Sequence, residues 1–160
     1  MSKKRLSQTK KNIVFLGHMG SGKSTIGRGL SKKLGLDFYD TDKEIEKEMG
    51  QKIAKIFDES GESIFRNIER KITLKLLDKK NSIIALGGGG FEDLKIRKLI
   101  LNKCNSIWLK CDLNILEKRC RVSKKRPLLS NKNIKAEFER LNKIRQKNYS
   151  KAKFTIDVSK

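Results

Sequence analysis

The sequence predicts an α/β fold in which a parallel β-sheet is covered by helices on both faces. Short apolar segments such as 13–16 and 83–86 are typical of buried parallel strands. These segments alternate along the chain with stretches whose apolar residues recur at helical spacing. Right-handed crossovers bring the carboxyl ends of parallel strands to one edge of the sheet, so the loops after the strands are expected to form one site.

The first strand, 13–16, leads into a glycine-rich loop and then into a helix. In this helix Ile26, Leu30 and Leu34 recur at every fourth position, which predicts an apolar face that packs on the sheet. Gly35 follows in the position that a C-cap glycine takes, so the helix is expected to end there.

The second strand is expected over 36–40 and ends on an acid. Residues 41–44, Thr-Asp-Lys-Glu, have the pattern of a capping box and are expected to start a helix. Ile45 and Met49 would form the inner face of this helix, and Gly50 would end it.

The rest of the chain continues the alternation. Apolar residues at helical spacing predict a helix that ends at Gly61 and a longer helix that begins at Glu62. The buried strand 83–86 then runs into four glycines, 87–90. The remaining expected elements are a helix over 94–100, a strand over 106–109, a helix over 113–121, a helix over about 135–149 and a strand over 154–158.

Length and composition favour one domain. With 160 residues, the chain is expected to form a single domain over 12–160, preceded by a solvated basic tail over 1–11. It has no apolar run near the ~20 residues that cross a bilayer and no apolar core of a secretory signal, so we expect no membrane partner. Cys104, Cys111 and Cys120 lack metal-ligand spacing and predict free thiols in a cytoplasmic protein.

The formal net charge of +21 suggests nucleic-acid binding as an alternative function. However, the 39 Lys and Arg residues are spread along the whole chain instead of forming one block. The few aromatic residues also show no alternation with basic residues that would suggest base stacking. We therefore interpret the charge as lysines on solvated helix faces and expect no nucleic-acid partner.

Residues 17–24, Gly-His-Met-Gly-Ser-Gly-Lys-Ser, match the phosphate-binding pattern G-x-x-x-x-G-K-S/T between a predicted strand and a predicted helix. Glycines let successive backbone N–H groups surround an anion, and the helix N-terminus adds partial positive charge. Lys23 can reach the outer phosphates of a nucleotide, and the Ser24 hydroxyl can ligate Mg²⁺. A turn that binds nothing is the alternative, but the flanking elements favour a nucleotide-phosphate site.

A phosphate-binding loop of this kind usually works with an acid that helps to hold the metal. The apolar strand 83–86 carries no carboxylate, so Asp40 and Asp42 at the neighbouring strand end are the candidates. One of them could hold Mg²⁺ through water while the other accepts the proton of an attacking hydroxyl. The alternative is that both serve only as turn and helix-cap residues.

Several motifs together resemble the shikimate kinase family, and they occur in the family's order and spacing. The motifs are the run from Gly17 to Arg28, Phe38-Tyr39-Asp40-Thr41-Asp42, Gly61-Glu62 followed by Phe65-Arg66, Gly87-Gly88-Gly89, Arg126-Pro127-Leu128-Leu129, and Arg145 with Tyr149. Many kinases share the phosphate-binding loop, whereas the combined set is specific to this family.

The resemblance implies a three-layer, nucleoside-monophosphate-kinase-like P-loop fold with a five-stranded parallel sheet and a mobile lid segment over about 121–130. It implies Mg²⁺-dependent transfer of the γ-phosphoryl group of ATP to the 3-hydroxyl of shikimate, in aromatic amino-acid biosynthesis. ATP and shikimate are then the expected partners, and a monomer is expected.

The resemblance also implies roles for the substrate-binding residues. Arg66 and Arg145 would clamp the shikimate carboxylate, for which a guanidinium is well shaped. Asp42 would orient or deprotonate the attacking hydroxyl. Gly88 and Gly89 would let the backbone approach the substrate ring where a side chain would clash.

On the nucleotide side, the resemblance implies that Ser24 and, through water, Asp40 hold Mg²⁺. Arg126 would close over the transferring phosphoryl group as an arginine finger does, and Arg119 would lie near the adenine. The implied ATP-binding residues are Gly20, Ser21, Gly22, Lys23, Ser24, Thr25, Arg119 and Arg126, and the implied catalytic residues are Lys23, Asp42 and Arg126.

Three further expectations concern single residues and the end of the sequence. Glu69 lies one helical turn after Arg66 and would either hold that guanidinium or form an ordinary exposed pair. His18, the one histidine, is expected to pack or to contact solvent instead of taking part in catalysis. The family usually continues after the last strand with an adenine-contacting loop and a helix, whereas this sequence ends at Lys160. Part of the base pocket and the cover of one sheet face are therefore expected to be missing, either in a minimal version with weaker nucleotide affinity or in a truncated product.

Two other functions remain as alternatives. A related small-molecule P-loop kinase, acting on gluconate or a nucleoside, is disfavoured because Arg66, Arg145 and Asp42 suit a polyol that carries a carboxylate. A binding protein that keeps the fold and uses its charge on nucleic acid would show steeply salt-dependent binding and no turnover of ATP.

Overall fold

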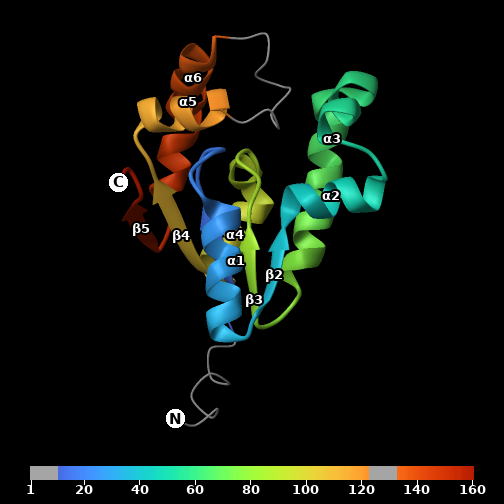
Figure 1. Cartoon of the computed structure of the whole chain (residues 1–160). Helices are drawn as coiled ribbons and strands as arrows, with labels where there is room; N and C mark the ends of the chain where they lie inside the picture. Colours follow the sequence, from blue (N-terminus) through green and yellow to red (C-terminus); the bar gives the residue numbers. More distant parts are fainter. Residues whose placement is uncertain (1–10, 123–132) are drawn as a thin grey trace.

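The computed structural model describes residues 11–122 and 133–160 and has a five-stranded parallel sheet with helices on both faces (Figure 1). The strand order is β2-β3-β1-β4-β5, and each pair of neighbours is parallel. The strands are β1 Ile13–Leu16, β2 Asp37–Asp40, β3 Ser82–Ala85, β4 Asn105–Lys110 and β5 Phe154–Asp157. This architecture confirms the predicted fold class. The lid segment from residue 123 onward and the tail before residue 11 lie outside the described residues.

All the predicted helices are present. They are α1 Lys23–Leu34, α2 Thr41–Met49, α3 Ile53–Leu77, α4 Leu94–Lys103, α5 Leu113–Val122 and α6 Ile134–Tyr149. A short 3₁₀ helix, η2 Gly90–Glu92, follows the glycine run and was not predicted. No helix within the two described ranges is both long enough and apolar enough to cross a bilayer.

The core lies on both faces of the sheet, because alternate side chains of the central strands point to opposite faces. Val14 and Ile84 face one side, where they pack with apolar residues of α3, α4 and α6. Phe15 and Ile83 face the other side, where they pack with Leu30 of α1. β1 and β3 are therefore buried on both faces, as their continuous apolar sequences predict. A further cluster, with Leu116, Cys120 and Phe138, lies between α5 and α6.

The prediction of the inner face of α1 was wrong in part. Gly27 and Ser31 are the buried residues of this helix, whereas Ile26 is 39% exposed. The cause is close packing, because a Cβ atom at Gly27 would lie only 2.7 Å from the Phe38 ring. The helix thus approaches the sheet along its small residues, which a count of apolar positions does not detect.

The start of α2 also differs from the prediction, because the N-cap is Asp40 and not Thr41. One carboxylate oxygen of Asp40 accepts hydrogen bonds from the backbone N–H groups of Asp42 (3.0 Å) and Lys43 (3.3 Å). Thr41 is fully buried inside the first turn, and its hydroxyl oxygen accepts a hydrogen bond from the Gly87 N–H at 2.7 Å. Gly50 ends the helix with φ of +66°, as predicted.

The two helices predicted around Gly61 form one element, α3, with a break at that residue. Gly61 has φ 82° and ψ 170°, a conformation that other residues rarely adopt. Phe57 and Phe65 pack together across the break with ring centroids 4.5 Å apart. The glycine therefore turns the first part of α3 over the carboxyl edge of the sheet while the second part covers one face.

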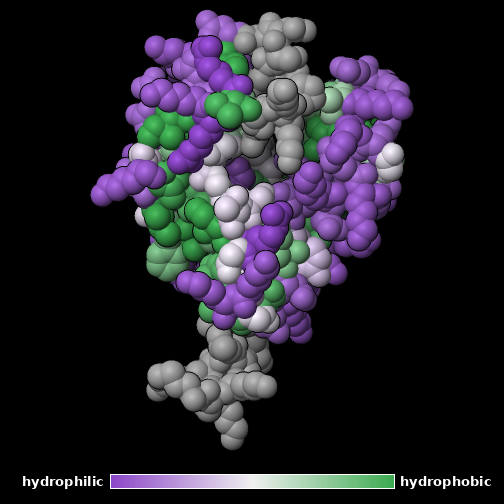
Figure 2. All heavy atoms as spheres, in the orientation of Figure 1, coloured by the Kyte–Doolittle hydropathy of each residue, from purple (hydrophilic) through white to green (hydrophobic). Residues whose placement is uncertain are grey.

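One edge of the sheet exposes apolar side chains. The register pairs Ile107 with Phe154 and Leu109 with Ile156, so these residues share the face that α1 covers. Phe154 is 50% exposed and Ile156 is 48% exposed. Figure 2 shows apolar residues gathered at this side of the molecule.

Candidate active site

The phosphate-binding loop lies between β1 and α1, at the carboxyl edge of the sheet (Figure 1). Gly20 and Gly22 have φ of +82° and +95°, which glycine adopts without strain. The Lys23 ammonium donates hydrogen bonds to the backbone carbonyls of Gly17 (2.6 Å) and His18 (2.9 Å). The lysine is thus folded over its own loop, where the outer phosphates of a nucleotide would sit.

Ser24 and Asp40 adjoin this loop and form a pair of oxygen ligands. The Ser24 hydroxyl donates a hydrogen bond to the Asp40 carboxylate oxygen that does not cap α2. A hydroxyl and a carboxylate fit Mg²⁺, which takes few protein ligands and completes its shell with water and phosphate oxygens. The two residues predicted for the metal therefore lie together beside the phosphate-binding loop.

Asp42 is the second residue of α2, and its side chain is largely shielded from solvent. Burial, together with the negative charge of Asp40, raises the pKa of Asp42 to about 6, while the nearby Lys23 ammonium lowers it. The carboxylate points at the glycine run, since a Cβ atom at Gly87 would come within 2.6 Å of its Oδ1 atom. It is therefore an acid between the nucleotide loop and the glycines, and it is ionised at neutral pH.

The first three of the four glycines after β3 are each approached by a different charged side chain. A Cβ atom at Gly88 would lie 2.8 Å from Nη1 of Arg145, and one at Gly89 would lie 2.6 Å from Nη1 of Arg66. At Gly87 the corresponding neighbour is Asp42. Because glycine has no side chain, a carboxylate from α2 and guanidinium groups from α6 and α3 can all lie against the same short segment.

Arg66 is fixed by acids on its own helix. Its guanidinium donates to Glu69 at 2.8 Å and to Glu62 at 3.4 Å. Glu69 is only 3% exposed, and burial raises its pKa while the adjacent Arg66 opposes this. Glu69 therefore holds the Arg66 guanidinium, which is the first of the two expectations, and the two residues do not form an ordinary exposed pair. About one third of the Arg66 side chain remains exposed and free to meet an anion.

Two residues that sequence analysis did not assign to the site fix the glycine backbone. The Tyr149 hydroxyl donates to the Gly88 carbonyl at 2.5 Å, and burial raises the pKa of Tyr149 to about 12. Thr41 accepts from the N–H of Gly87. The signal for Tyr149 is its place one turn after Arg145, whereas Thr41 looked like a helix cap.

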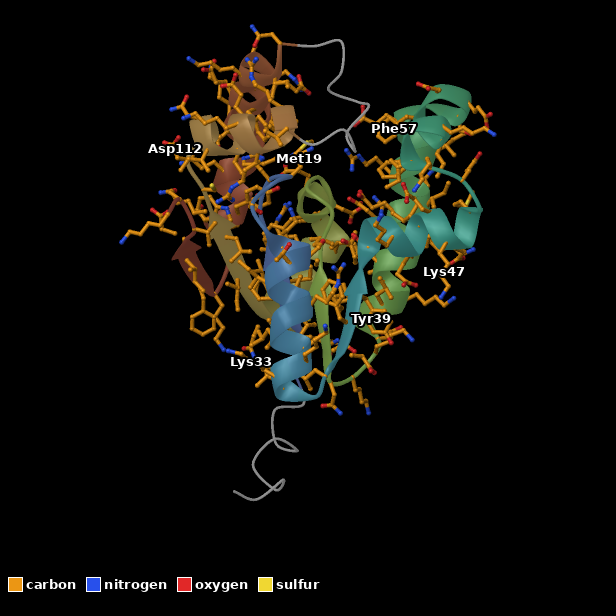
Figure 3. The ribbon with its side chains drawn as sticks, in the orientation of Figure 1. Met19, Lys33, Tyr39, Lys47, Phe57 and Asp112 are labelled. Carbon is orange, nitrogen blue, oxygen red and sulfur yellow. The ribbon has the colours of Figure 1, made fainter. Side chains whose placement is uncertain are left out.

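In Figure 3, Met19 of the phosphate-binding loop and Phe57 of α3 lie on either side of the site, and side chains with nitrogen and oxygen atoms lie between them. Lys23 and Ser24 begin α1, Asp40 ends β2 and Asp42 belongs to the first turn of α2, so all four follow the ends of β1 and β2. Arg66, Arg145 and the glycines complete it, so the structure brings together most of the residues predicted from sequence. Ser21 is buried in the loop, and Thr25 is an exposed residue of α1.

Arg119 contacts the nucleotide loop away from the glycine run. Its guanidinium donates to the Gly20 carbonyl at 3.0 Å and to Cys111 Sγ at 3.8 Å. The arginine of the predicted lid, Arg126, lies outside the described residues. Cys104, Cys111 and Cys120 are free thiols, as expected.

His18 packs inside the protein, as predicted, and is 4% exposed. Its ring packs in T-shaped geometry against the rings of Phe138 and Tyr149. Burial lowers the pKa of His18 to about 4, and the positive charges of Arg145 and Lys23 act in the same direction. The imidazole is therefore neutral at physiological pH.

This buried histidine predicts acid sensitivity of the fold. The unfolded chain binds the His18 proton near pH 6.5 and the folded chain near pH 4, so stability falls as the pH drops through that window. From pH 7 to pH 5 we expect the wild type to lose about 2 kcal/mol more than His18→Gln. Urea unfolding of both proteins at the two pH values measures this, and the opposite contribution of Asp42, whose pKa is raised, cancels in the comparison. Equal losses would contradict a buried neutral imidazole.

The glycine run gives a prediction that separates binding from folding. Gly89 has φ −92°, which alanine also adopts, so the cost of Gly89→Ala is its contact with the Arg66 guanidinium. Because that flexible group can move aside, we expect the thermal midpoint to stay close to that of the wild type while the KM for the acid substrate rises about 10- to 100-fold. Gly29→Ala, where nothing lies within 4 Å, is the matched control. An unchanged KM would show that the close approach is irrelevant to binding.

Comparison with known proteins agrees with this geometry. The sequence model of the family described as shikimate kinase matches residues 19–160. The chain is 43% identical to a shikimate kinase of Bartonella quintana, over 96% of this chain and 73% of the relative. It is 45% identical to one of Persephonella marina, over 84% of this chain and 83% of the relative.

Solved structures show the same similarity. The shikimate kinase of Acinetobacter baumannii in complex with shikimate superposes with a TM-score of 0.91 and 33% identity, over 98% of this chain and 88% of that one. The enzyme of Aquifex aeolicus gives a TM-score of 0.81 and 34% identity, over 93% and 88%. A phosphate-binding loop, an acid pair and a glycine run contacted by two arginines lie at one edge of the sheet, and the relatives are similar over most of the chain. This chain belongs to the shikimate kinase family.

Proposed function

We propose that this chain transfers the γ-phosphoryl group of ATP to the 3-hydroxyl of shikimate, the reaction that the family's name describes, on the route to chorismate and the aromatic amino acids. The observation that carries this proposal is the convergence of Asp42, Arg145 and Arg66 on Gly87, Gly88 and Gly89. Two guanidinium groups and one carboxylate suit a substrate that has one carboxylate and several hydroxyls.

In this proposal the acid substrate is held by its charge. Arg66 and Arg145 would bind its carboxylate with charge-assisted hydrogen bonds, and Glu69 keeps Arg66 in place. Because Gly88 and Gly89 have no side chains, the two guanidinium groups lie directly against this backbone, beside which the ring would bind. The bound acid is thereby fixed with its hydroxyls toward Asp42.

The nucleotide would be held by the phosphate-binding loop. Lys23 would exchange the carbonyls of Gly17 and His18 for the outer phosphate oxygens, and the loop N–H groups would bind the inner ones. Ser24 and, through water, Asp40 would hold Mg²⁺, which when bound neutralises charge on the phosphates. Arg119, beside Gly20, is proposed to lie near the adenine, and Arg126 to stabilise the transferring group.

Asp42 would act on the attacking hydroxyl. The oxygen of that hydroxyl forms a bond to the γ-phosphorus, the bond to the β–γ bridging oxygen breaks, and ADP leaves. The proton passes from the hydroxyl to the Asp42 carboxylate, which is ionised at neutral pH because its pKa is about 6. The Lys23 ammonium, which would bind the phosphates, also lowers the pKa of Asp42, so the two groups lie close together.

A panel of acceptors tests the proposed function. The purified chain is incubated with Mg²⁺ and ATP plus shikimate, gluconate or a nucleoside, and ADP is measured by a coupled assay. We expect turnover with shikimate alone, and phosphorus NMR should place the new phosphate on the 3-oxygen. Phosphorylation of gluconate or a nucleoside but not shikimate would support a different P-loop kinase.

The remaining expectations are part of the same proposal. We propose a cytoplasmic protein that acts as a monomer on small molecules, with one domain over 12–160 and a lid about 121–130. Salt-dependent binding to DNA or RNA without turnover of ATP would instead support the nucleic-acid-binding alternative.

A further inference from the structure

His18 belongs to the phosphate-binding loop, but its side chain points to α6, the helix that carries Arg145. The imidazole Nε2 lies 3.1 Å from Oδ1 of Asn142, and a carbonyl oxygen can only accept, so Nε2 carries the proton. The Asn142 amide in turn donates to Oε1 of Gln146 at 3.1 Å, one helical turn further on. A directed chain of hydrogen bonds thus joins the loop to the exposed side of α6.

The ring of the same histidine touches the acid-binding end of that helix. Its centroid lies 5.4 Å from that of Tyr149, in T-shaped geometry. Tyr149 is the residue whose hydroxyl holds the Gly88 carbonyl, and Arg145 covers Gly88 from the same helix. His18 therefore contacts Tyr149, which supports the Gly88 backbone and lies on the same helix as Arg145, one of the two arginines proposed to bind the substrate carboxylate.

The His18 imidazole is neutral and buried, and it lies near a cation of each substrate site. Lys23 of the nucleotide site and Arg145 of the acid site both act electrostatically on the imidazole, which is 4% exposed. Nδ1 is buried and has no hydrogen-bond partner among the described residues. The ring is neutral although both cations act on it, and its single donor is committed to α6.

We infer that His18 is a positioning residue for the acid substrate, because it ties α6, and with it Arg145 and Gly88, to the nucleotide loop. This inference rests on the proposed function. It assigns a residue of the nucleotide loop to the binding of the other substrate, through Asn142 and Tyr149. Small shifts matter in such a site, since displacement of a clamp by about 1 Å can cost up to 10²-fold in rate.

The test compares His18→Phe, which keeps an aromatic ring but removes the donor, with His18→Gln, whose amide nitrogen can replace Nε2. Steady-state kinetics are measured with shikimate and ATP varied in turn. For His18→Phe we expect the KM for shikimate to rise about 5- to 20-fold and the KM for ATP to change less than about 2-fold. His18→Gln should restore the KM for shikimate to within about 3-fold of the wild type.

Asn142→Ala gives the same test from the other side of the hydrogen bond, and it remains informative if His18→Phe does not fold. Asn142 is partly exposed on α6, so its truncation should leave the fold intact while raising the KM for shikimate. Combined with His18→Phe, it should add little, because both changes remove one interaction. His18 is the sole histidine, so nitrogen NMR of the one imidazole reports directly whether Nε2 is protonated and whether shikimate shifts its signal.

Each outcome bears on the inference. Unchanged kinetics in both His18→Phe and Asn142→Ala, equal rises in both KM values, or an Nδ1-protonated ring would overturn it while leaving the proposed function in place. Failure of the wild type to bind or phosphorylate shikimate would overturn the proposed function and this inference together. A selective rise in the KM for shikimate, restored by His18→Gln, would support it.

Discussion

Asp42→Asn is expected to lower kcat for shikimate phosphorylation by about 10²- to 10⁴-fold. The amide keeps the shape of the carboxylate but cannot take the proton of the attacking hydroxyl. It also removes a negative charge that lies close to Lys23 and faces Gly87. Steady-state kinetics with shikimate and MgATP measure the effect, and circular dichroism checks that the fold is retained.

Asp42→Asn should also weaken shikimate binding, because the carboxylate accepts hydrogen bonds from substrate hydroxyls. The matched control is Asp93→Asn, an N-cap acid of α4 that pairs with Arg70 outside the site. This control should leave kcat within about 2-fold of the wild type, with a small loss of stability from its altered cap. Near wild-type kinetics for Asp42→Asn would exclude Asp42 from the reaction.

Arg66→Lys is expected to raise the KM for shikimate by about 10- to 100-fold with a much smaller effect on the KM for ATP. A lysine can still pair with Glu69, but its ammonium cannot make the two-pronged contact of a guanidinium with a carboxylate. Loss of one charge-assisted hydrogen bond is worth about 1.5–3 kcal/mol, which corresponds to the stated range. Kinetics with each substrate varied in turn provide the measurement.

Arg70→Lys supplies the control for this change, since Arg70 lies on the same helix and pairs with Asp93 instead of facing the glycines. Its kinetics should stay near those of the wild type. If Arg66→Lys weakened both substrates equally, the role of Arg66 would be to support the fold.

Sequence reasoning located the nucleotide side of the site because the signals are local. The glycine loop, the strand before it and the helix after it follow one another along the chain, and each has its own pattern. The same holds for Asp40 and Asp42, because β2 ends at Asp40 and α2 begins at the next residue. Local patterns also gave the order of the strands and helices.

The acid side could not be worked out from local patterns. Arg66 and Arg145 lie on α3 and α6, and only tertiary packing brings both to the glycine run. In the sequence each is one of 39 basic residues, so its role came from resemblance alone. The bond between His18 and Asn142, 124 residues apart, has no sequence signal at all.

The errors at α1 and α2 have physical causes of the same kind. Ile26 looked like a core residue by its spacing, but close packing at Gly27 turned a different face of α1 to the sheet. Thr41 looked like a helix cap, but the carboxylate of Asp40 was available one residue earlier, and Thr41 instead supports Gly87. In both cases a tertiary contact decided between two locally reasonable choices.

The most direct test of this account measures whether the two substrates meet at the same edge of the sheet. Mn²⁺ replaces Mg²⁺ with a non-hydrolysable ATP analogue, and NMR records the relaxation of shikimate protons in the presence of the protein. The account predicts strongly enhanced relaxation, greatest for the proton on the carbon that bears the 3-hydroxyl, with loss of the effect in Arg66→Lys at the same shikimate concentration. Shikimate that binds without any enhancement would place it away from the metal-bound phosphates and contradict the account.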